Sequence, residues 1–348
     1  MEQDRCKYFG VCGGCETSDF STEAKVSNLR NNLARHNVDF ALMREMITLP
    51  MGIRRRANLK IDYGCNVGFY KRATNDVVGI SRCRMVTDEI NRIIRNLPVL
   101  CKALVKRSDG ACFVTKVANG VVIHFENVNF TPLDIPKVKN FATQLSIIRV
   151  TSGADVIFES EMPVVEFGGI SVPYPINTFL QPSKEGEDAI VSVVREFMGD
   201  VHYRKIADLF CGLGLFSFNT YNMADEIVAF DCNRLATDMI NKVSRSRHLN
   251  ITAKCVDLFS KPVKSEALSS CNLIILDPPR DGAKNQVLQI AKSNVARVIY
   301  VSCNPITFAE DAKILLNAGY KIDVIQPIDQ FTYTHHTELV ALFSKPSF

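Results

Sequence analysis

The chain has 348 residues, of which 47% are hydrophobic and 22% are charged, as in a globular protein with room for two domains. No apolar stretch is long enough to cross a bilayer, and the acidic opening, residues 1–6, lacks the apolar run of a secretory leader. We therefore expect a cytoplasmic protein with no membrane partner, whose 12 cysteines serve metal binding or thiol chemistry rather than disulfides.

The net charge of +4 is unevenly distributed along the chain. Residues 1–110 contain 19 Lys and Arg against 12 Asp and Glu, whereas the remainder is slightly acidic. A basic front half favours a polyanionic partner such as nucleic acid. A solvated charged surface produces the same pattern, so charge alone leaves both interpretations open.

Cysteines gather at the start of the chain, where Cys6, Cys12 and Cys15 stand in the run Cys-x5-Cys-Gly-Gly-Cys. A fourth, Cys83, lies in the basic run Ser-Arg-Cys-Arg. Four thiolates can hold an iron–sulfur cluster, and they can equally hold zinc. The spacing leaves these two alternatives open, with free thiols as a third.

The front half is predicted to be mainly β. Residues 23–36 carry apolar side chains along one face of a helix, and residues 54–80 favour short strands joined by turns. A helix pair interrupted at Pro98 is predicted over 87–107. Strands are then predicted from 113 to 167, where β-branched and aromatic residues gather.

Cations and aromatic residues alternate within the strands predicted over 54–80. Arg54, Arg55, Arg56 and Lys60 are followed by the run Phe-Tyr-Lys-Arg at 69–72. Such a surface neutralises phosphates and stacks on unpaired bases. The run therefore predicts an RNA-binding face, with a solvated strand face as the alternative.

The pattern changes near residue 180, and we place a domain boundary between segments 1–175 and 176–348. Ser183 is predicted to cap a helix that runs to about Gly199. Strands and helices then alternate, which predicts a mostly parallel sheet in a doubly wound α/β domain with ligands at the carboxyl ends of its strands. The predicted strands are 205–210, 226–230, 251–256, 272–276, 297–302, 320–326 and 338–343.

The first of these strands ends in the run Asp-Leu-Phe-Cys-Gly-Leu-Gly, from Asp208 to Gly214. Its two glycines let a ligand approach the backbone closely, but the spacing is not that of a dinucleotide fingerprint. Asp231 ends the next strand, where a carboxylate accepts hydrogen bonds from ribose hydroxyls. An adenosine cofactor without a pyrophosphate fits this pattern, and S-adenosylmethionine is such a cofactor.

Two further strand tips carry reactive groups. Asp277 precedes Pro-Pro at the end of the fourth strand, in an arrangement that recurs in methyltransferases, and Cys303 follows the fifth strand. A thiolate that adds to carbon-6 of a pyrimidine makes carbon-5 nucleophilic towards a methyl donor, and a base must then remove the carbon-5 proton. Glu338, which opens the last strand, is the carboxylate best placed in sequence for that task.

These motifs together resemble the RNA uracil-5 methyltransferase family. The matching segments are Phe-Leu-Gln at 179–181, the run 208–214, Asp-Pro-Pro-Arg at 277–280, Ser-Cys-Asn-Pro at 302–305 and Thr-His-His-Thr-Glu at 334–338. The resemblance implies a Rossmann-like class I methyltransferase domain behind an N-terminal, mainly β RNA-binding domain. It also implies that Cys303 is the nucleophile, Glu338 the proton acceptor, and that S-adenosylmethionine is contacted by Gln181, Phe210, Asp231 and Asp277.

The resemblance further implies a four-iron four-sulfur cluster on Cys6, Cys12, Cys15 and Cys83, since the ribosomal RNA branch of the family carries one on this pattern. We therefore expect a monomer that methylates a uridine of 23S ribosomal RNA. A transfer RNA substrate is the nearest alternative. A non-enzymatic iron–sulfur RNA-binding protein is another, and an amino-methylating enzyme a third, although neither needs both Cys303 and Glu338.

Overall fold

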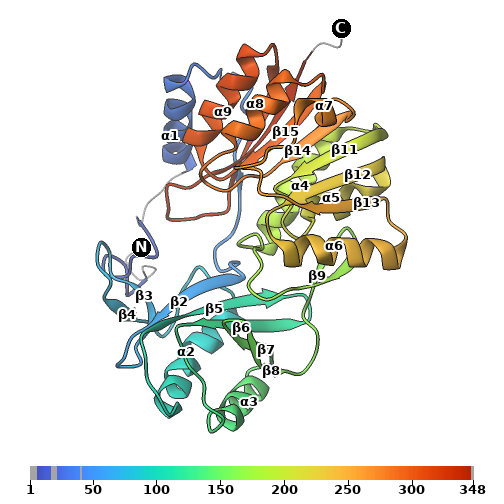
Figure 1. Ribbon diagram of the computed structural model, residues 1–348. Helices are drawn as coiled ribbons and strands as arrows, with labels where there is room; N and C mark the ends of the chain where they lie inside the picture. The colour runs from blue at the N-terminus through green and yellow to red at the C-terminus, as the bar shows by residue number, and fades with distance from the viewer. Residues whose placement is uncertain (1–5, 17–21, 40, 346–348) are drawn as a thin grey trace.

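The computed structural model describes residues 6–16, 22–39 and 41–345. Two large sheets, each covered by helices, lie one above the other in Figure 1, and the chain crosses between them more than once; a third sheet is the hairpin of β9 (Val164–Phe167) and β10 (Ile170–Pro173). Within the described residues no helix is long and apolar enough to cross a membrane. The acidic opening on which the expectation of no leader rests lies mostly outside the described residues.

The C-terminal sheet has eight strands in the order β1-β16-β17-β15-β14-β11-β12-β13. Strands β11 to β15 are parallel, whereas β17 is antiparallel to both β15 and β16. The mostly parallel sheet is thus confirmed, with all seven predicted strands present. Their bounds are β1 Ile47–Thr48, β11 Tyr203–Leu209, β12 Ala224–Asp231, β13 Ile251–Cys255, β14 Leu273–Leu276, β15 Arg297–Ser302, β16 Lys321–Asp329 and β17 Glu338–Ser344.

Helices cover both faces of this sheet, because its strands are apolar on both sides. One face packs against α4 (Lys184–Met198), α5 (Leu215–Thr220) and α6 (Arg234–Arg247). The other packs against α7 (Ser265–Leu268), α8 (Lys284–Lys292), α9 (Pro305–Asn317) and α1 (Thr22–Arg35). A short 3-10 helix, η1 (Tyr221–Met223), leads into β12.

Helix α1 confirms the helix predicted at 23–36, but it joins the C-terminal half: Leu29 and Leu33 are fully buried beside α9. Strand β1 likewise pairs with β16. The N-terminal segment therefore completes the C-terminal core before the chain enters the other sheet. The boundary near residue 175 stays a prediction.

The N-terminal sheet has seven strands in the order β4-β3-β2-β5-β6-β7-β8, with α2 (Asp88–Ala103) and α3 (Ile135–Gln144) packed on one face. A hairpin of β9 and β10 then leads back to the other half, where its apolar side chains join the core. The bounds are β2 Arg56–Ile61, β3 Val67–Tyr70, β4 Val77–Gly79, β5 Gly110–Val117, β6 Gly120–Glu126, β7 Ile147–Ser152, β8 Asp155–Glu159, β9 Val164–Phe167 and β10 Ile170–Pro173.

The helix pair predicted over 87–107 is wrong, because α2 is one continuous helix with Pro98 inside it. Proline removes a backbone hydrogen bond from a helix. Here the apolar face continues on both sides of Pro98, from Ile90 to Leu100, and is buried against the sheet. Burial of that face outweighs the missing hydrogen bond. Ser183, by contrast, caps α4 as predicted, accepting a hydrogen bond from the Gly186 N–H at 3.0 Å.

Candidate active site

A cavity of about 510 Å³ lies at the carboxyl ends of the parallel strands. The chain brings its residues there from strand tips, because parallel strands present their carboxyl ends at one edge of the sheet. All six side chains that the sequence assigns to the cofactor and the chemistry line this one cavity: Gln181, Phe210, Asp231, Asp277, Cys303 and Glu338.

At one end of the cavity the turn after β11 is shaped for a close ligand. Phe210 and Gly212 both have positive φ angles, of 60° and 52°. The two oxygens of the Asp231 carboxylate accept hydrogen bonds from the N–H groups of Gly212 at 2.9 Å and Asn233 at 2.8 Å. Asp231 is thereby fixed at the tip of β12, where a ribose would lie. Asp257, on the next turn, also lines the cavity.

Asp208 opens the same motif but does not line the cavity. Its carboxylate is buried, and one oxygen accepts hydrogen bonds from the Ser217 N–H at 2.9 Å and hydroxyl at 2.6 Å. Burial raises its pKa to about 7 despite those bonds. Asp208 thus joins β11 to α5 and shapes the turn from behind.

The same cavity holds two buried carboxyl groups, those of Asp277 and Glu338, which lie close enough to act on each other electrostatically. The Gln181 Nε2 donates to Asp277 Oδ2 at 3.2 Å, and the Gln330 Nε2 donates to Glu338 Oε2 at 2.8 Å. Burial raises the pKa of Glu338 to about 7. Burial and the neighbouring Glu338 raise the pKa of Asp277 well above its usual range. One of these two groups can therefore hold a proton near neutral pH and exchange it with a substrate.

Cys303 stands between β15 and α9, half-buried at the edge of this carboxyl pair. The next residue, Asn304, caps α9 by accepting a hydrogen bond from the Ile306 N–H, which fixes the turn. Burial, then the charges of Glu338 and Asp277, raise the pKa of Cys303 to about 11, while Arg280 lowers it. The thiol is therefore protonated at neutral pH until something in the site favours the thiolate.

Two residues of the site received no role from the sequence. Gln330 is almost fully buried and bridges Glu338 and Gln181, to whose Oε1 its Nε2 lies at 3.4 Å. Arg280 donates to the His336 Nε2 at 2.7 Å and lowers the pKa of Glu338. Arg280 directly follows the Asp-Pro-Pro motif, and this position could have identified it as a site residue from the sequence. Gln330 follows a strand rather than a motif and gave none.

The four predicted cysteine ligands line a second cavity, of about 720 Å³, between the N-terminal segment and the loop before α2. Burial and the neighbouring Cys83 raise the pKa of Cys15 to about 11. Asn91 holds the Cys83 backbone at both ends, accepting from its N–H at 2.8 Å and donating to its carbonyl at 2.9 Å. Across the described part of the chain, no group of three or more His, Cys, Asp or Glu is arranged to hold a metal ion.

The RNA-binding face predicted around Arg54–Arg56 is wrong for Arg55, which is buried and paired with Glu187. The Arg54 and Arg56 guanidinium groups lie over the rings of Phe331 and Phe179, at 5.7 and 4.9 Å from their centres. The sequence pattern does not distinguish arginines that face RNA from arginines that join the two halves of the chain.

Cations and aromatics do gather further along the same strands. A hollow of about 540 Å³ is lined by Lys60, Phe69, Tyr70, Lys71 and Arg72. The Lys60 ammonium lies 5.4 Å from the centre of the Tyr70 ring. This basic hollow adjoins the cysteine cavity, since Gly14 and Phe69 line both.

Known proteins resemble this chain along almost its whole length. A family model described as tRNA (Uracil-5-)-methyltransferase matches residues 139–346. RNA methyltransferases of Caulobacter vibrioides and Zymomonas mobilis, both named uncharacterized, are 32% and 31% identical over 98% of this chain, and the matches cover 85% and 88% of those relatives.

A solved structure shares the fold of this chain. It is that of the Pyrococcus abyssi tRNA (uracil-54, C5)-methyltransferase in complex with S-adenosyl-L-homocysteine. The two folds agree with a TM-score of 0.71 at 22% sequence identity, over 96% of this chain and 86% of the other. The likeness confirms the α/β methyltransferase fold predicted from the sequence.

Proposed function

This chain belongs to the tRNA (uracil-5-)-methyltransferase family and is an RNA methyltransferase that uses S-adenosylmethionine, and we propose that it methylates carbon-5 of a uridine through a covalent bond to Cys303. The observation that carries the proposal is the single cavity lined by Cys303, Glu338 and the predicted cofactor residues. Neither a binding protein nor an amino-methylating enzyme needs a thiol beside a buried carboxyl pair.

We assign the end of the cavity around Phe210 and Asp231 to the adenosine part of the cofactor. The fixed Asp231 carboxylate suits the ribose hydroxyls, and the positive φ angles of Phe210 and Gly212 open the turn to a close ligand. Gln181 and Asp277 would then lie towards the sulfonium and the base. Bound S-adenosylmethionine would supply the methyl group.

The reaction would begin when the Cys303 thiol loses its proton to water and its sulfur bonds to carbon-6 of the uracil. The electron pair pushed onto the ring makes carbon-5 a nucleophile, and carbon-5 would take the methyl group as the methyl–sulfur bond of the sulfonium breaks and its electron pair stays on the departing sulfur. Glu338 would then accept the carbon-5 proton, the carbon–sulfur bond breaks, and the thiolate returns. A pKa of about 7 suits a base that must be ionised when it acts and protonated afterwards.

We propose that Cys6, Cys12, Cys15 and Cys83 hold a four-iron four-sulfur cluster. One observation supports the proposal: all four thiols line one cavity, where burial and then the neighbouring Cys83 raise the pKa of Cys15. Among the described residues these thiols are not yet arranged as a metal site, so the cluster would have to draw them together. The thiolates would anchor the N-terminal segment to the loop before α2. Methyl transfer as written needs no electron from the cluster, so its role would be to shape the surface beside the basic hollow.

For the substrate we favour large-subunit ribosomal RNA, because the cysteine pattern resembles that of the ribosomal RNA branch. Transfer RNA is the second candidate, favoured by the descriptions of the matching family model and of the Pyrococcus abyssi enzyme. The two candidates share the chemistry and differ only in what the N-terminal half must recognise.

The test offers protein-free large-subunit RNA and unmodified transfer RNA to the purified protein with a labelled methyl donor. We expect label in ribosomal RNA alone. Label in transfer RNA alone would contradict the substrate assignment and leave the chemistry standing. In a parallel reaction, Glu338→Gln should accumulate a covalent RNA–protein band on denaturing gels, and its absence, with activity lost, would contradict the role of Glu338 as the final base.

A further inference from the structure

The segment before α4 carries Gln181 into the cavity, and it is held from behind by Arg56, the first residue of β2, and by Arg55 directly before it. The carbonyl of Leu180 accepts a hydrogen bond from Arg56 Nη1 at 2.6 Å, and that of Gln181 accepts one from Arg55 Nε at 3.0 Å. The carbonyl of Pro182 accepts the backbone N–H of Arg55 at 2.8 Å. Three consecutive carbonyls are thus fixed by two neighbouring residues.

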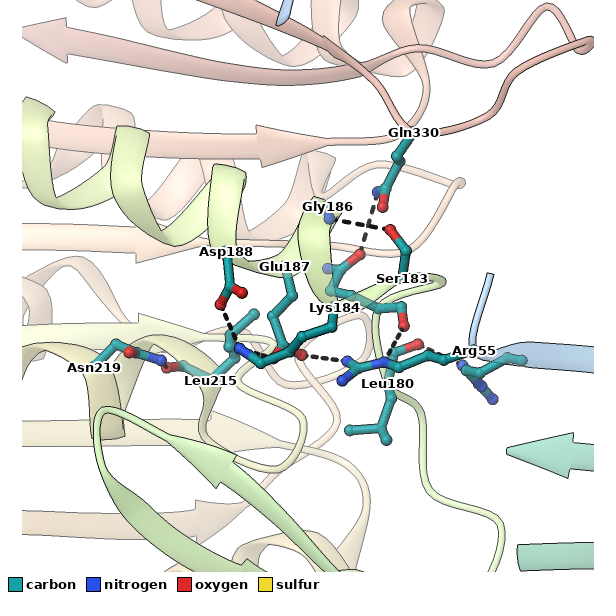
Figure 2. A network of polar contacts seen from close by, with 12 residues as sticks. Arg55, Leu180, Ser183, Lys184, Gly186, Glu187, Asp188, Leu215, Asn219 and Gln330 are labelled. Atoms are coloured by element: carbon teal, nitrogen blue, oxygen red, sulfur yellow. Dashed lines mark hydrogen bonds and ion pairs between the residues drawn. The ribbon is translucent and has the colours of Figure 1, made fainter. Parts of the chain in front are cut away.

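Arg55 makes a further contact besides these hydrogen bonds to the segment. Its Nη2 also pairs with Glu187, on the first turn of α4, and both side chains are buried. Figure 2 shows Arg55 reaching from the N-terminal sheet to Glu187 and the segment beside Leu180, with Gln330 and Gly186 on the far side of the segment. A planar guanidinium donates in two directions at once, which an ammonium group on a flexible stem does not do in a fixed geometry.

The other side of the same segment faces the reaction. The Gln181 side chain donates to Asp277 and lies 3.4 Å from Gln330, which in turn donates to Glu338. One chain of contacts therefore runs from Arg55 through Gln181 to both carboxyl groups. Arg55 itself does not line the catalytic cavity. Its own backbone carbonyl accepts from Lys116 of β5, so the chain begins inside the N-terminal sheet.

We propose that Arg55 is a positioning residue for methyl transfer: it fixes Gln181 against Asp277 and so couples the N-terminal sheet to the catalytic carboxyl groups. The proposal rests on the proposed function. Arg55 would keep the Gln181 side chain in contact with Asp277. This role explains why Arg55 is buried although it stands in a run of basic residues. A displacement of about 1 Å at a reacting group reduces turnover roughly 100-fold, so a small release of the segment would be visible.

The first test measures, without RNA or cofactor, hydrogen exchange of the backbone N–H groups that hold the segment, those of Arg55, which donates to Pro182, and Gly186, which donates to Ser183. Arg55→Lys keeps a charge for Glu187 but loses the second donor, and it should speed exchange at both groups. Arg297→Met is the matched control, because Arg297 donates to the Phe197 carbonyl at 2.5 Å, at the other end of α4. Equal exchange in Arg55→Lys and wild type would overturn the proposal, whether or not the protein methylates uridine.

The second test asks whether Arg55 acts through Gln181. Arg55→Lys should lower kcat roughly 10- to 100-fold with little change in the KM for RNA. In a background already carrying Gln181→Ala, the same change should have almost no further effect, since the group that Arg55 positions is gone. If the kcat of the double variant falls by the product of the two single reductions, Arg55 acts independently of Gln181, and the coupling is overturned.

A third variant guards against loss of folding. Removing Arg55 alone takes the closer of two cations from the buried Glu187 and leaves it only Lys184, whose Nζ lies 3.3 Å from Oε1, so the variant should be destabilised. The pair Arg55→Met with Glu187→Leu removes both charges, and we expect it to fold and to show the fast exchange and reduced kcat of Arg55→Lys. Wild-type exchange and kcat in a folded double variant would also contradict the proposal. If wild type itself methylates no RNA, the proposed function fails. The exchange result still shows whether Arg55 holds the segment that carries Gln181.

Discussion

The charge of Glu338 should control the reactivity of Cys303. The Cys303 pKa of about 11 lies two units above its ordinary value of 9.0, and at pH 8 it leaves about one thiol in a thousand ionised. Returning the Cys303 pKa to its ordinary value would raise the thiolate fraction at pH 8 about 100-fold. Burial is the largest cause and remains in a variant, whereas Glu338 is the largest charged cause. We therefore expect Glu338→Gln to speed alkylation of Cys303 about tenfold at pH 8.5.

The pH dependence gives this prediction a sign. The pKa of Glu338 is raised to about 7, so below pH 6 Glu338 is mostly protonated and adds no negative charge. Wild type and Glu338→Gln should then react at the same rate at pH 6 and separate above pH 7. The assay is iodoacetamide alkylation of RNA-free protein, with the Cys303 peptide followed by mass spectrometry.

Asp257→Asn is the control, because Asp257 lines the cavity without contributing to the Cys303 pKa. It should alkylate like wild type at every pH. Equal alkylation of Glu338→Gln and wild type at pH 8.5 would refute the electrostatic coupling. A difference that persists at pH 6 would instead mean that the substitution opens the site to the reagent.

Three further predictions concern stability, metal and RNA. Burial raises the pKa of Asp208 to about 7 from an ordinary 3.8, so between pH 4 and 7 the folded chain keeps this proton and the unfolded chain loses it. The free energy of unfolding should therefore fall as the pH rises from 4 to 7. Urea titrations should show a flatter fall with pH in Asp208→Asn, and the same dependence on pH as in wild type would contradict this. Anaerobically purified protein should contain iron and acid-labile sulfide that are lost in Cys12→Ser with Cys15→Ser, and stoichiometric zinc without iron would contradict the cluster. Lys60→Ala should weaken RNA binding and lower the slope of log affinity against log salt by about 1, while an unchanged slope would show that Lys60 meets no phosphate.

The sequence predicted the C-terminal half well, for a physical reason. Buried parallel strands are short apolar runs, and polar residues directly after them lie at one edge of the sheet. The sequence alone therefore predicted that Asp231, Asp277 and Cys303 lie close together. The antiparallel β17 was located, and it places Glu338 beside the tip of β15.

The N-terminal half was harder to predict because its contacts are long-range. Helix α3 was missed, although Val138, Phe141 and Ala142 repeat at helical spacing, because strands dominate the pattern around it. Nothing local shows that α1 packs on the C-terminal sheet or that Arg55 pairs with a residue on α4. Such pairings depend on the whole fold, and a run of three arginines resembles a phosphate-binding surface until one of them is seen to be buried.

The most direct measurement locates the methyl group that this protein adds. Large-subunit RNA incubated with wild type and trideuteromethyl S-adenosylmethionine is digested to nucleosides and analysed by mass spectrometry. We predict a trideuterated 5-methyluridine with wild type and none with Cys303→Ala, although that variant should still bind S-adenosylhomocysteine. Label on a ribose or an exocyclic nitrogen, or 5-methyluridine formed at the wild-type rate by Cys303→Ala, would contradict the account.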